Sequence, residues 1–437
     1  MHTIKKNFMR MMNFVEKIKT IITRKSLANS LRQVTFFSGV GFLAQIIMMI
    51  YTILVARALG PNQLGVYSGL YAITGVSITF VNFGLDLWML KEAHHYDSIQ
   101  IITGKIITIK LVLGFFWGII CLIFLPLTQS QFFTHTLVLL AVGDVICDIL
   151  FNTITTSWTI QRKIKQLNIM LLFSRAGKLV LLLVLIALIN LSPVTVISSR
   201  FLISFFTLLI SLLILKPIMP KGKIKELFTI VKESSAFGFS EILAMIYANI
   251  DVVILTFFSI SDTGLYSPAS GIIHALFIIP NSFYVYLLPK YSKQVSGDKE
   301  TNLRKLTRNV LLIFSLIGLV LSLGLLISGK MMITLILGDK YLVTGDLIRI
   351  LSPIMLFKSI AFGLALVIVI TGKQKKRLLP QMIVSVLNIT FNILLLPYFG
   401  LFSVAWIYTS CELILMLGYL LIVLMVIKNG KIRKTAS

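Results

Sequence analysis

Acidic residues, and charged residues in general, are scarce in this sequence. Of its 437 residues only 16 are Asp or Glu, against 41 Lys or Arg, and 13% are charged against 57% hydrophobic. A soluble domain carries roughly 25% charged residues, so these charges are too few to cover a soluble fold of this size. We therefore expect lipid to be the solvent of most of the chain. The formal charge of +25 falls in short clusters between apolar runs, which indicates membrane topology rather than nucleic-acid binding.

Cysteine is also rare, and its placement excludes two further classes of protein. Cys121, Cys147 and Cys411 each lie within an apolar run, so neither a disulfide framework nor a CxxC metal pair is expected. A cleavable signal peptide is not expected either, because the N-terminus is long and basic and the first apolar run begins near Val34.

The apolar runs predict an all-α membrane protein with twelve transmembrane helices. A spanning helix needs about 20 mainly apolar residues, and the apolar piece within 329–346 is too short to span. Pro268 and Pro280 are expected to kink the eighth span. The predicted spans are 34–56, 66–90, 106–127, 136–158, 169–190, 194–215, 235–258, 268–289, 309–328, 347–371, 379–397 and 401–427.

Lys and Arg are almost missing from every second connection between these spans. With the N-terminus placed inside, the inner segments carry 32 of the 41 basic residues, and the outer loops carry 3, namely Arg57, Lys330 and Lys340. This asymmetry predicts cytoplasmic N- and C-termini and an even number of spans. The outer loops are too short for a globular catalytic domain, so the function has to lie in the helices.

Two of the inner segments show apolar residues at helical spacing between basic ones. Residues 1–33 predict a basic amphipathic helix on the cytoplasmic leaflet. A second such segment, 224–231, precedes span seven and is the natural linker between two halves. Specific lipid binding and a plain positive-inside flank are both open for these segments, and the tail 428–437 is a third basic stretch.

A short repeat organises the spans into two halves. The residues GVYS at 65–68 recur as GLYS at 264–267, and each copy follows an odd-numbered span and opens the next one. The repeat predicts two six-helix lobes of parallel topology, 34–220 and 221–427. Transporters are often built from such repeats about a pseudo-two-fold axis normal to the membrane, with the substrate path between the halves.

Three longer runs in both halves carry a family resemblance. They are LVARALGPNQLGVYS followed by NFGLDLWMLKE, NIDVVILTFFSISDTGLYSPAS, and LNITFNILLLPYFGLFSVAW. In this order the chain resembles the polysaccharide-transport (Wzx-type) flippases of the MATE-like (MOP) superfamily over nearly its whole length.

The resemblance implies a function and its partners. Members move polyprenyl-diphosphate-linked oligosaccharides across the cytoplasmic membrane by alternating access between two six-helix lobes, for O-antigen, capsule or exopolysaccharide synthesis. The expected partners are an undecaprenyl-diphosphate-linked glycan and membrane lipid, with a polysaccharide polymerase as a further candidate. The resemblance implies no cofactor and no enzymatic step, and leaves coupling to an H⁺ or Na⁺ gradient open.

Ionisable residues deep within the predicted spans mark the candidate site, because each costs at least ~2.5–3.5 kcal/mol on insertion scales. Asp144 and Asp148 share one face of span four, and Arg175 and Lys178 share one face of span five. At about 1.5 Å per residue, their depths predict the pairs Asp148–Arg175 and Asp144–Lys178.

The same arithmetic pairs Lys358 with Glu412, whereas Arg200, Glu241 and His274 are left without an obvious partner. Basic groups are suited to bind a diphosphate or acidic sugars, and acidic groups to take up the coupling ion. Glu241 is the best single coupling candidate. Each ion pair is equally explained as structural bracing between helices within one lobe.

For five further residues a structural role explains their position at least as well as a functional one. Asp86 and Asp251 are expected near span ends, although Asp251 also lies in the span-seven motif. Arg57 either meets exported glycan or anchors the end of span one, and Asn388 and Asn392 hydrogen-bond either sugar hydroxyls or a neighbouring helix. Together the residues predict substrate binding by Arg57, Arg175, Lys178, Arg200, Lys358, Asn388 and Asn392, and ion coupling by Asp144, Asp148, Glu241, Asp251, His274 and Glu412.

Two other functions compete with a flippase. A MATE-type exporter of small cationic compounds predicts a net acidic cavity, but the deep acids and bases balance, four against four. A membrane-embedded polymerase or prenyl transferase needs a large outer loop or Asp-rich cytoplasmic motifs, whereas the inner loops here are basic. The exporter therefore remains the main alternative, and an enzyme ranks last.

Overall fold

The computed structural model describes residues 40–41, 43–93, 96, 98–218, 224–297 and 303–428, and this part of the chain is helical without strands. The predicted basic helix of residues 1–33 and nearly all of the predicted tail 428–437 lie outside the described residues. After a helical stretch at 43–77, the helices are α2 (Thr79–Asn82), α3 (Leu85–Glu92), α4 (Ile99–Thr128), α5 (His135–Ile160), α6 (Ile164–Leu188), α7 (Pro193–Leu215), α8 (Ile224–Phe258), α9 (Ile260–Leu276), α10 (Ile278–Gly297), α11 (Leu303–Leu337), α12 (Leu342–Leu351), α13 (Pro353–Ile370), α14 (Leu378–Phe399) and α15 (Leu401–Lys428).

Eleven helical segments of the described chain are long and apolar enough to cross a membrane, and one of them holds two of the predicted spans. That segment, Leu43–Glu92, has 50 residues. A straight helix of that length would measure about 75 Å, more than twice the ~30 Å hydrocarbon core. Gly60 has a φ of +71°, a left-handed conformation that glycine adopts readily, and it separates span one from span two. With this turn the described residues contain the twelve expected spans.

Several span limits differ from the sequence prediction. The apolar piece within 329–346 continues the ninth span, because α11 runs without a break to Leu337. The eighth span begins at Ile260 rather than 268, and its helix breaks at Phe277. Pro280 explains this break, since its ring would clash with the carbonyl of the residue four positions earlier. Pro268, by contrast, lies inside the continuous α9.

The second span also breaks, at a place the sequence analysis did not identify. Phe83 and Gly84 both have positive φ values, 40° and 69°, and they separate α2 from α3. The second span of each half is therefore interrupted, at Phe83–Gly84 in the first half and at Phe277 in the second.

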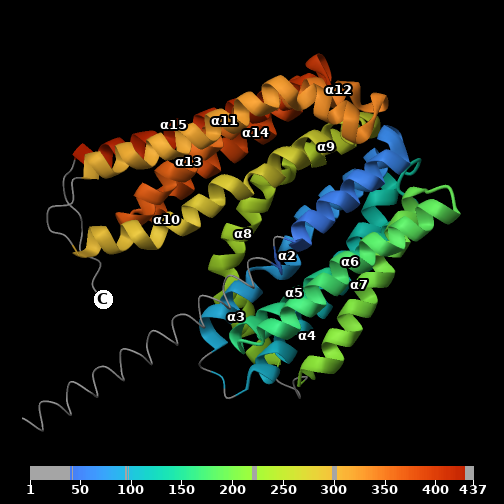
Figure 1. Ribbon diagram of the computed structural model, residues 1–437. Helices are drawn as coiled ribbons and strands as arrows, with labels where there is room; N and C mark the ends of the chain where they lie inside the picture. The colour runs from blue at the N-terminus through green and yellow to red at the C-terminus, as the bar shows by residue number, and fades with distance from the viewer. Residues whose placement is uncertain are drawn as a thin grey trace, which may run out of the picture.

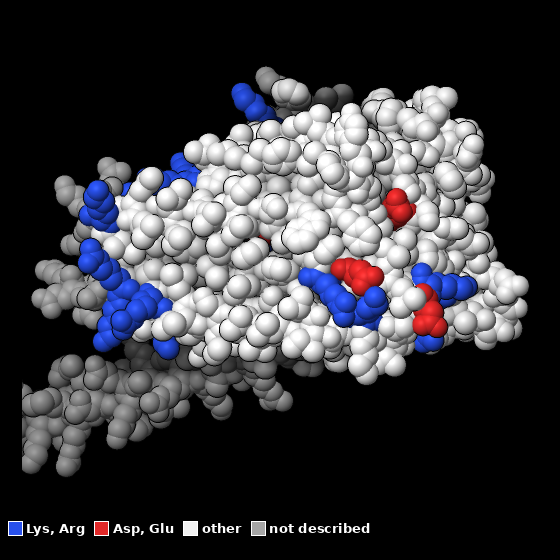
Figure 2. Space-filling model, turned by 90° about the horizontal axis from the view of Figure 1, so that it is seen from above, with Lys and Arg blue, Asp and Glu red and all other residues white. Residues whose placement is uncertain are grey.

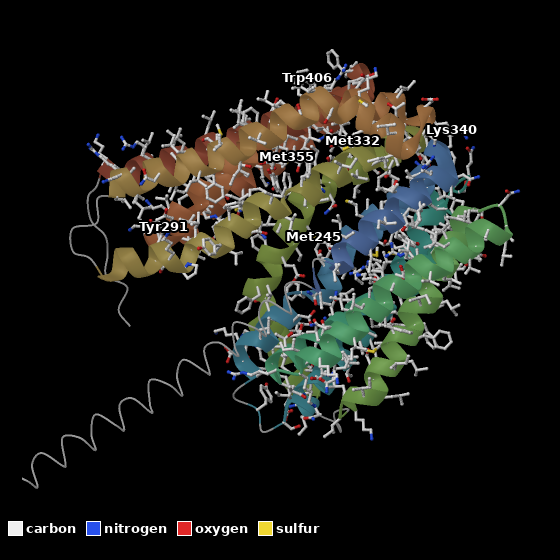
Figure 3. The ribbon with its side chains drawn as sticks, in the orientation of Figure 1. Met245, Tyr291, Met332, Lys340, Met355 and Trp406 are labelled. Carbon is white, nitrogen blue, oxygen red and sulfur yellow. The ribbon has the colours of Figure 1, made fainter. Side chains whose placement is uncertain are left out.

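The helices form two groups with α8 between them (Figure 1). The helices α4–α7 lie with the first two spans on one side, and α10–α15 lie on the other. Met245, in the middle of α8, lies between the groups (Figure 3). The N-terminal half of α8 packs on α2 and α3, and its C-terminal half packs on α14 and α9. The division into lobes at residues 220 and 221 stays a prediction, because α8 contacts both groups.

The two groups converge where span one ends, which we call the Gly60 end (Figure 1). A β-carbon added to Gly65 would lie 1.8 Å from the carbonyl oxygen of Ile260, and one added to Gly264 would lie 1.8 Å from that of Pro61. Pro61 and Gly65 are each 199 residues before Ile260 and Gly264. Asn62 and Ser261 are also 199 residues apart, and Ser261 donates to Asn62 at 2.8 Å. The two copies of the repeat therefore contact each other, and each copy packs its glycine against the backbone just before the other copy.

The opposite end, which we call the basic end, is where α11 begins and α15 ends. On the face carrying α11 and α15, Lys and Arg gather at this end with no acidic side chain visible among them, whereas acidic and basic side chains mix near the Gly60 end (Figure 2). Tyr291 lies toward the basic end and Lys340 at the Gly60 end (Figure 3).

Candidate functional site

A compact cluster of charged side chains lies within the first group of helices. Asp144 on α5 is at its centre and is fully buried. Its carboxylate accepts hydrogen bonds from Tyr71 at 2.6 Å, from Ser204 at 2.6 Å and from the Nε of Arg200 at 3.0 Å. Two helices, α7 and the stretch 43–77, therefore supply donors to this carboxylate of α5, as expected for a buried charge that has to be paired and hydrogen-bonded.

The second carboxylate of the cluster belongs to Asp148, one turn further along α5. Its oxygens lie 3.1 and 3.3 Å from the ammonium of Lys178 on α6, which also lies 3.8 Å from Asp144. Lys178 is fully buried, whereas the Asp148 side chain is 34% exposed. The Ser204 hydroxyl also lies 3.0 Å from Asp148, so its single proton is shared between the two carboxylates.

These contacts correct two of the predicted pairings. Asp148 was paired with Arg175, but its partners are Lys178 at 3.1 Å and Arg200 at 3.8 Å, and Arg175 has no hydrogen bond or ion pair within the described part of the chain. The predicted Asp144–Lys178 pair is present at 3.8 Å. Arg200 was left without a partner, but it binds Asp144, donates to the Tyr67 hydroxyl at 2.7 Å and stacks 4.2 Å above the Tyr71 ring. Arg200 lies on α7, and α5 packs more extensively on α7 than on α6, so the nearest base to Asp144 belongs to span six rather than span five.

A cavity of about 440 Å³ lies in the second group of helices, against α8. Lys358 lies at its wall and forms a 2.6 Å ion pair with the buried Glu412, as the depth arithmetic predicted. Its ammonium also lies 4.8 Å from the ring centre of Tyr247 and 5.3 Å from that of Phe277. The remaining polar wall is formed by Gln374, Arg377, Gln381 and Tyr419.

The cavity reaches the basic end of the molecule. Gln374 and Arg377 belong to the short connection between α13 and α14, which lies at that end. Arg377 stacks 5.4 Å from the Tyr419 ring centre and its Nε lies 3.5 Å from the Tyr419 hydroxyl. Among the described residues no carboxylate lines this cavity, and the charged groups that face it are the two bases Lys358 and Arg377.

Glu241 has a partner that the sequence did not reveal. Its carboxylate accepts a 2.6 Å hydrogen bond from Asn82 of α2. Its second oxygen and the Asn82 side-chain oxygen are buried without a hydrogen bond. Close by, Gly84 and Gly238 are in direct backbone contact, so this polar link lies where α8 crosses the first group of helices.

Asp251 lies on α8 and His274 on α9, and His274 lies beside the Lys358 cluster because its ring and the Lys358 ammonium both contact the Phe277 ring. His274 contacts the Tyr408 hydroxyl at 3.1 Å. Asp251 was expected near a span end, but it is buried seven residues before the end of α8 and accepts hydrogen bonds from Tyr266 and the Val252 amide.

The last predicted site residues lie apart from both charged clusters. Asn388 and Asn392 are buried and bond to each other within α14, Asn392 donating to the Asn388 side chain at 3.0 Å. Arg57 is exposed near the Gly60 end. The structure therefore brings neither asparagine nor Arg57 to the cavity.

One buried ion pair was missed altogether. Lys110 on α4 is buried with both oxygens of Asp86 at 2.8 Å and the Thr153 hydroxyl at 2.7 Å. The pair could have been predicted from depth. Asp86 lies four residues from the inner end of predicted span two, and Lys110 lies four residues from the inner end of predicted span three. This pair ties α3, α4 and α5 together beside the Glu241 link.

Comparison with known proteins places this architecture in a family. Residues 30–295 match the family described as polysaccharide biosynthesis protein, which is more than half of the chain. The chain belongs to this family. A relative, the capsular polysaccharide biosynthesis protein CapF of Staphylococcus aureus, is 25% identical over 199 residues, which are 45% of this chain and 50% of CapF. The matched region thus spans about half the length of that curated relative.

Two solved structures show the same fold. The lipid II flippase MurJ, in an inward closed conformation, superposes with a TM-score of 0.72 at 14% identity, over 89% of this chain and 87% of MurJ. An inward-facing multidrug resistance MATE transporter of the MOP superfamily gives a TM-score of 0.70 at 14% identity, over 90% of this chain and 96% of that one. The chain is thus a multi-pass membrane protein with the MOP transporter fold.

Proposed function

We propose that this chain is a flippase that moves polyprenyl-diphosphate-linked oligosaccharide across the cytoplasmic membrane, with both termini on the cytoplasmic side. The carrying observation is the cavity against α8, whose charged lining groups are Lys358 and Arg377 with no carboxylate among them. An ammonium and a guanidinium facing one cavity are suited to a diphosphate, because charge-assisted hydrogen bonds to phosphate oxygens are the strong ones.

The direction of the cavity fits loading from the cytoplasm. It reaches the basic end, where Lys and Arg gather, and the positive-inside rule assigns such an end to the cytoplasm. The Gly60 end is closed by the reciprocal glycine contacts. We propose that the substrate enters from the basic end and that separation of the two helix groups at the Gly60 end releases it outside.

The carboxylates supply candidates for coupling to an H⁺ or Na⁺ gradient. Glu241 is the strongest, because one of its oxygens is buried without a hydrogen bond and its link to Asn82 joins α8 to the first group of helices. Asp144 and Asp148 already hold Lys178 and Arg200, and Glu412 holds Lys358. We propose that a cation that binds to Glu241 weakens its hydrogen bond with Asn82 and so loosens the contact between α8 and α2.

A MATE-type exporter of cationic compounds is the alternative, and the aromatic rings around the cavity favour it. Cations bind over aromatic faces, and Tyr247, Phe362 and Tyr419 line this cavity. The Tyr247 and Tyr419 rings already face Lys358 and Arg377, however. A cationic substrate would have to displace a resident base, whereas an anionic one would bind to it.

A binding measurement separates the two functions. The purified chain is titrated with a polyprenyl-diphosphate-linked oligosaccharide and, separately, with a hydrophobic cationic dye. We expect the lipid-linked glycan to bind, and Arg377→Ala to weaken it by roughly tenfold or more, as loss of a charge-assisted contact predicts. Dye binding that Arg377→Ala strengthens, together with no glycan binding, would establish the exporter instead.

A further inference from the structure

A second cavity lies on the outer face of the α10–α15 group, between the start of α11 and the end of α15. It measures about 310 Å³ and has an open mouth. Its lining residues are Arg304, Thr307, Arg308, Leu311, Leu312, Ser315 and Ile427. We call it the α11–α15 groove. It shares no lining residue with the cavity of the proposed substrate path.

The groove has a polar and an apolar part. Arg304 and Arg308 are one helical turn apart, so their guanidinium groups emerge on the same face of α11 at the basic end. Both are exposed, and neither has a hydrogen bond or ion pair within the described residues. Leu311, Leu312 and Ile427 continue the groove away from the arginines.

A buried polar atom inside the groove is also without a partner. Thr307 is 5% exposed, yet its hydroxyl makes no hydrogen bond. A buried hydroxyl normally finds an acceptor or donor, often the carbonyl one turn earlier in a helix. Its position between the two arginines therefore points to a ligand with oxygen atoms.

The groove lies on a surface suited to lipid. Exposed apolar side chains run along the same face of α11 beyond it, including Leu316, Val320 and Ile327. On this face an almost uncharged area separates the Lys and Arg at the basic end from the mixed acidic and basic side chains nearer the Gly60 end (Figure 2). A ligand here has its charged end at the membrane–water boundary and its apolar part against the helices.

We infer that the α11–α15 groove binds an anionic glycerophospholipid of the leaflet at the basic end. The phosphate lies between Arg304 and Arg308 with an ester or phosphate oxygen accepting from Thr307, and an acyl chain lies along Leu311, Leu312 and Ile427. Basic pockets between transmembrane helices are suited to such headgroups. This site is independent of the transported substrate, so the inference stands whether or not the proposed function does.

Native mass spectrometry of the full chain, with phosphatidylglycerol or phosphatidylcholine added to the detergent, tests the site. We expect one tightly retained phosphatidylglycerol and no equivalent phosphatidylcholine. Arg304→Ala with Arg308→Ala should weaken retention about 30-fold, from about 1 kcal/mol per basic group. Lys375→Ala with Lys376→Ala is the matched control, because it removes two exposed charges from the same end outside the groove.

Three results would overturn the inference. They are equal retention of the two lipids, retention of phosphatidylglycerol in the arginine double variant at the wild-type level, and an equal loss in the lysine control. Thr307→Val separates a specific site from general charge attraction, because it keeps both arginines and the size of the side chain. We expect it to weaken retention by several-fold, and an unchanged affinity would likewise contradict a built site.

Discussion

Gly65 and Gly264 each lie against the backbone of the helix that carries the other. The two contacts are equivalent under the repeat, since Gly65 meets Ile260 and Gly264 meets Pro61. Such close approach is available only to glycine, because any β-carbon would overlap a carbonyl oxygen. The closed state of the Gly60 end therefore depends on two residues of the repeated GVYS and GLYS segments.

We predict that Gly264→Ala opens the Gly60 end. Its β-carbon would lie 1.8 Å from the Pro61 carbonyl oxygen, so the helices have to separate. Asn62→Cys with Ser261→Cys, in a chain whose three native cysteines are replaced, should form a disulfide in the wild-type background. The disulfide yield should fall several-fold in Gly264→Ala.

Gly271→Ala is the control for this experiment. It lies in the same α9 helix and a β-carbon there meets nothing within 4 Å. It should leave the disulfide yield unchanged and stabilise the helix slightly, by up to about 1 kcal/mol. Equal yields from Gly264→Ala and Gly271→Ala would show that the glycine contact does not hold this end closed.

The two carboxylates of the first cluster should differ in their effect on stability. Asp144 is fully buried and accepts from three side chains, so Asp144→Ala leaves Arg200 and Lys178 buried with too little compensation. We expect a loss of about 3–5 kcal/mol. Asp148→Ala should cost clearly less because its side chain is 34% exposed. Thermal unfolding of the purified variants in one detergent measures the difference, and equal unfolding midpoints contradict the assignment.

The Lys358–Glu412 pair permits a test that separates bracing from binding. Lys358→Met alone leaves Glu412 as an unpaired buried charge and should destabilise the chain by about 3–5 kcal/mol. Adding Glu412→Gln removes that charge and should restore expression and the unfolding midpoint. Glycan transport should nevertheless stay lost, because the ammonium that faces the cavity is gone. A double variant that transports at the wild-type rate would make the pair a brace only.

The coupling role proposed for Glu241 predicts a specific loss. Glu241→Gln keeps an oxygen that can accept from Asn82, so the fold should persist, while the group that takes up a cation is removed. Transport in proteoliposomes should then respond no longer to an imposed H⁺ or Na⁺ gradient. Glu226→Gln is the control, since Glu226 is a partly exposed acid on the same helix. An undiminished gradient response in Glu241→Gln would exclude Glu241 as the coupling group.

The sequence predicted the fold better than the site, for a physical reason. Span number follows from apolar length alone, and the repeat follows from identical residues, so both were read without knowing any contact. The Lys358–Glu412 pair was predicted correctly because the number of residues from the end of a span gives the depth of each side chain in the membrane. The pairing of Arg200 with Asp144 was not found, because the order of helices around a group is not encoded in depth.

Two other contacts show the same limit. Asn82 and Glu241 are 159 residues apart, and they meet only because α8 crosses to the first group of helices. Lys110 and Asp86 were within reach of the depth argument, but Asp86 was assigned to a span end and Lys110 was not considered. The break at Phe83–Gly84 carries no proline, and only a glycine after an aromatic residue marked it.

The central claim is transport of a lipid-linked glycan, and the most direct measurement is the sidedness of that glycan in cells lacking the chain. We predict that undecaprenyl-diphosphate-linked oligosaccharide accumulates on the cytoplasmic leaflet, and that the wild-type chain, but not the Lys358→Met, Glu412→Gln double variant, restores its export. An unchanged amount and sidedness of the lipid-linked glycan after deletion would contradict the claim.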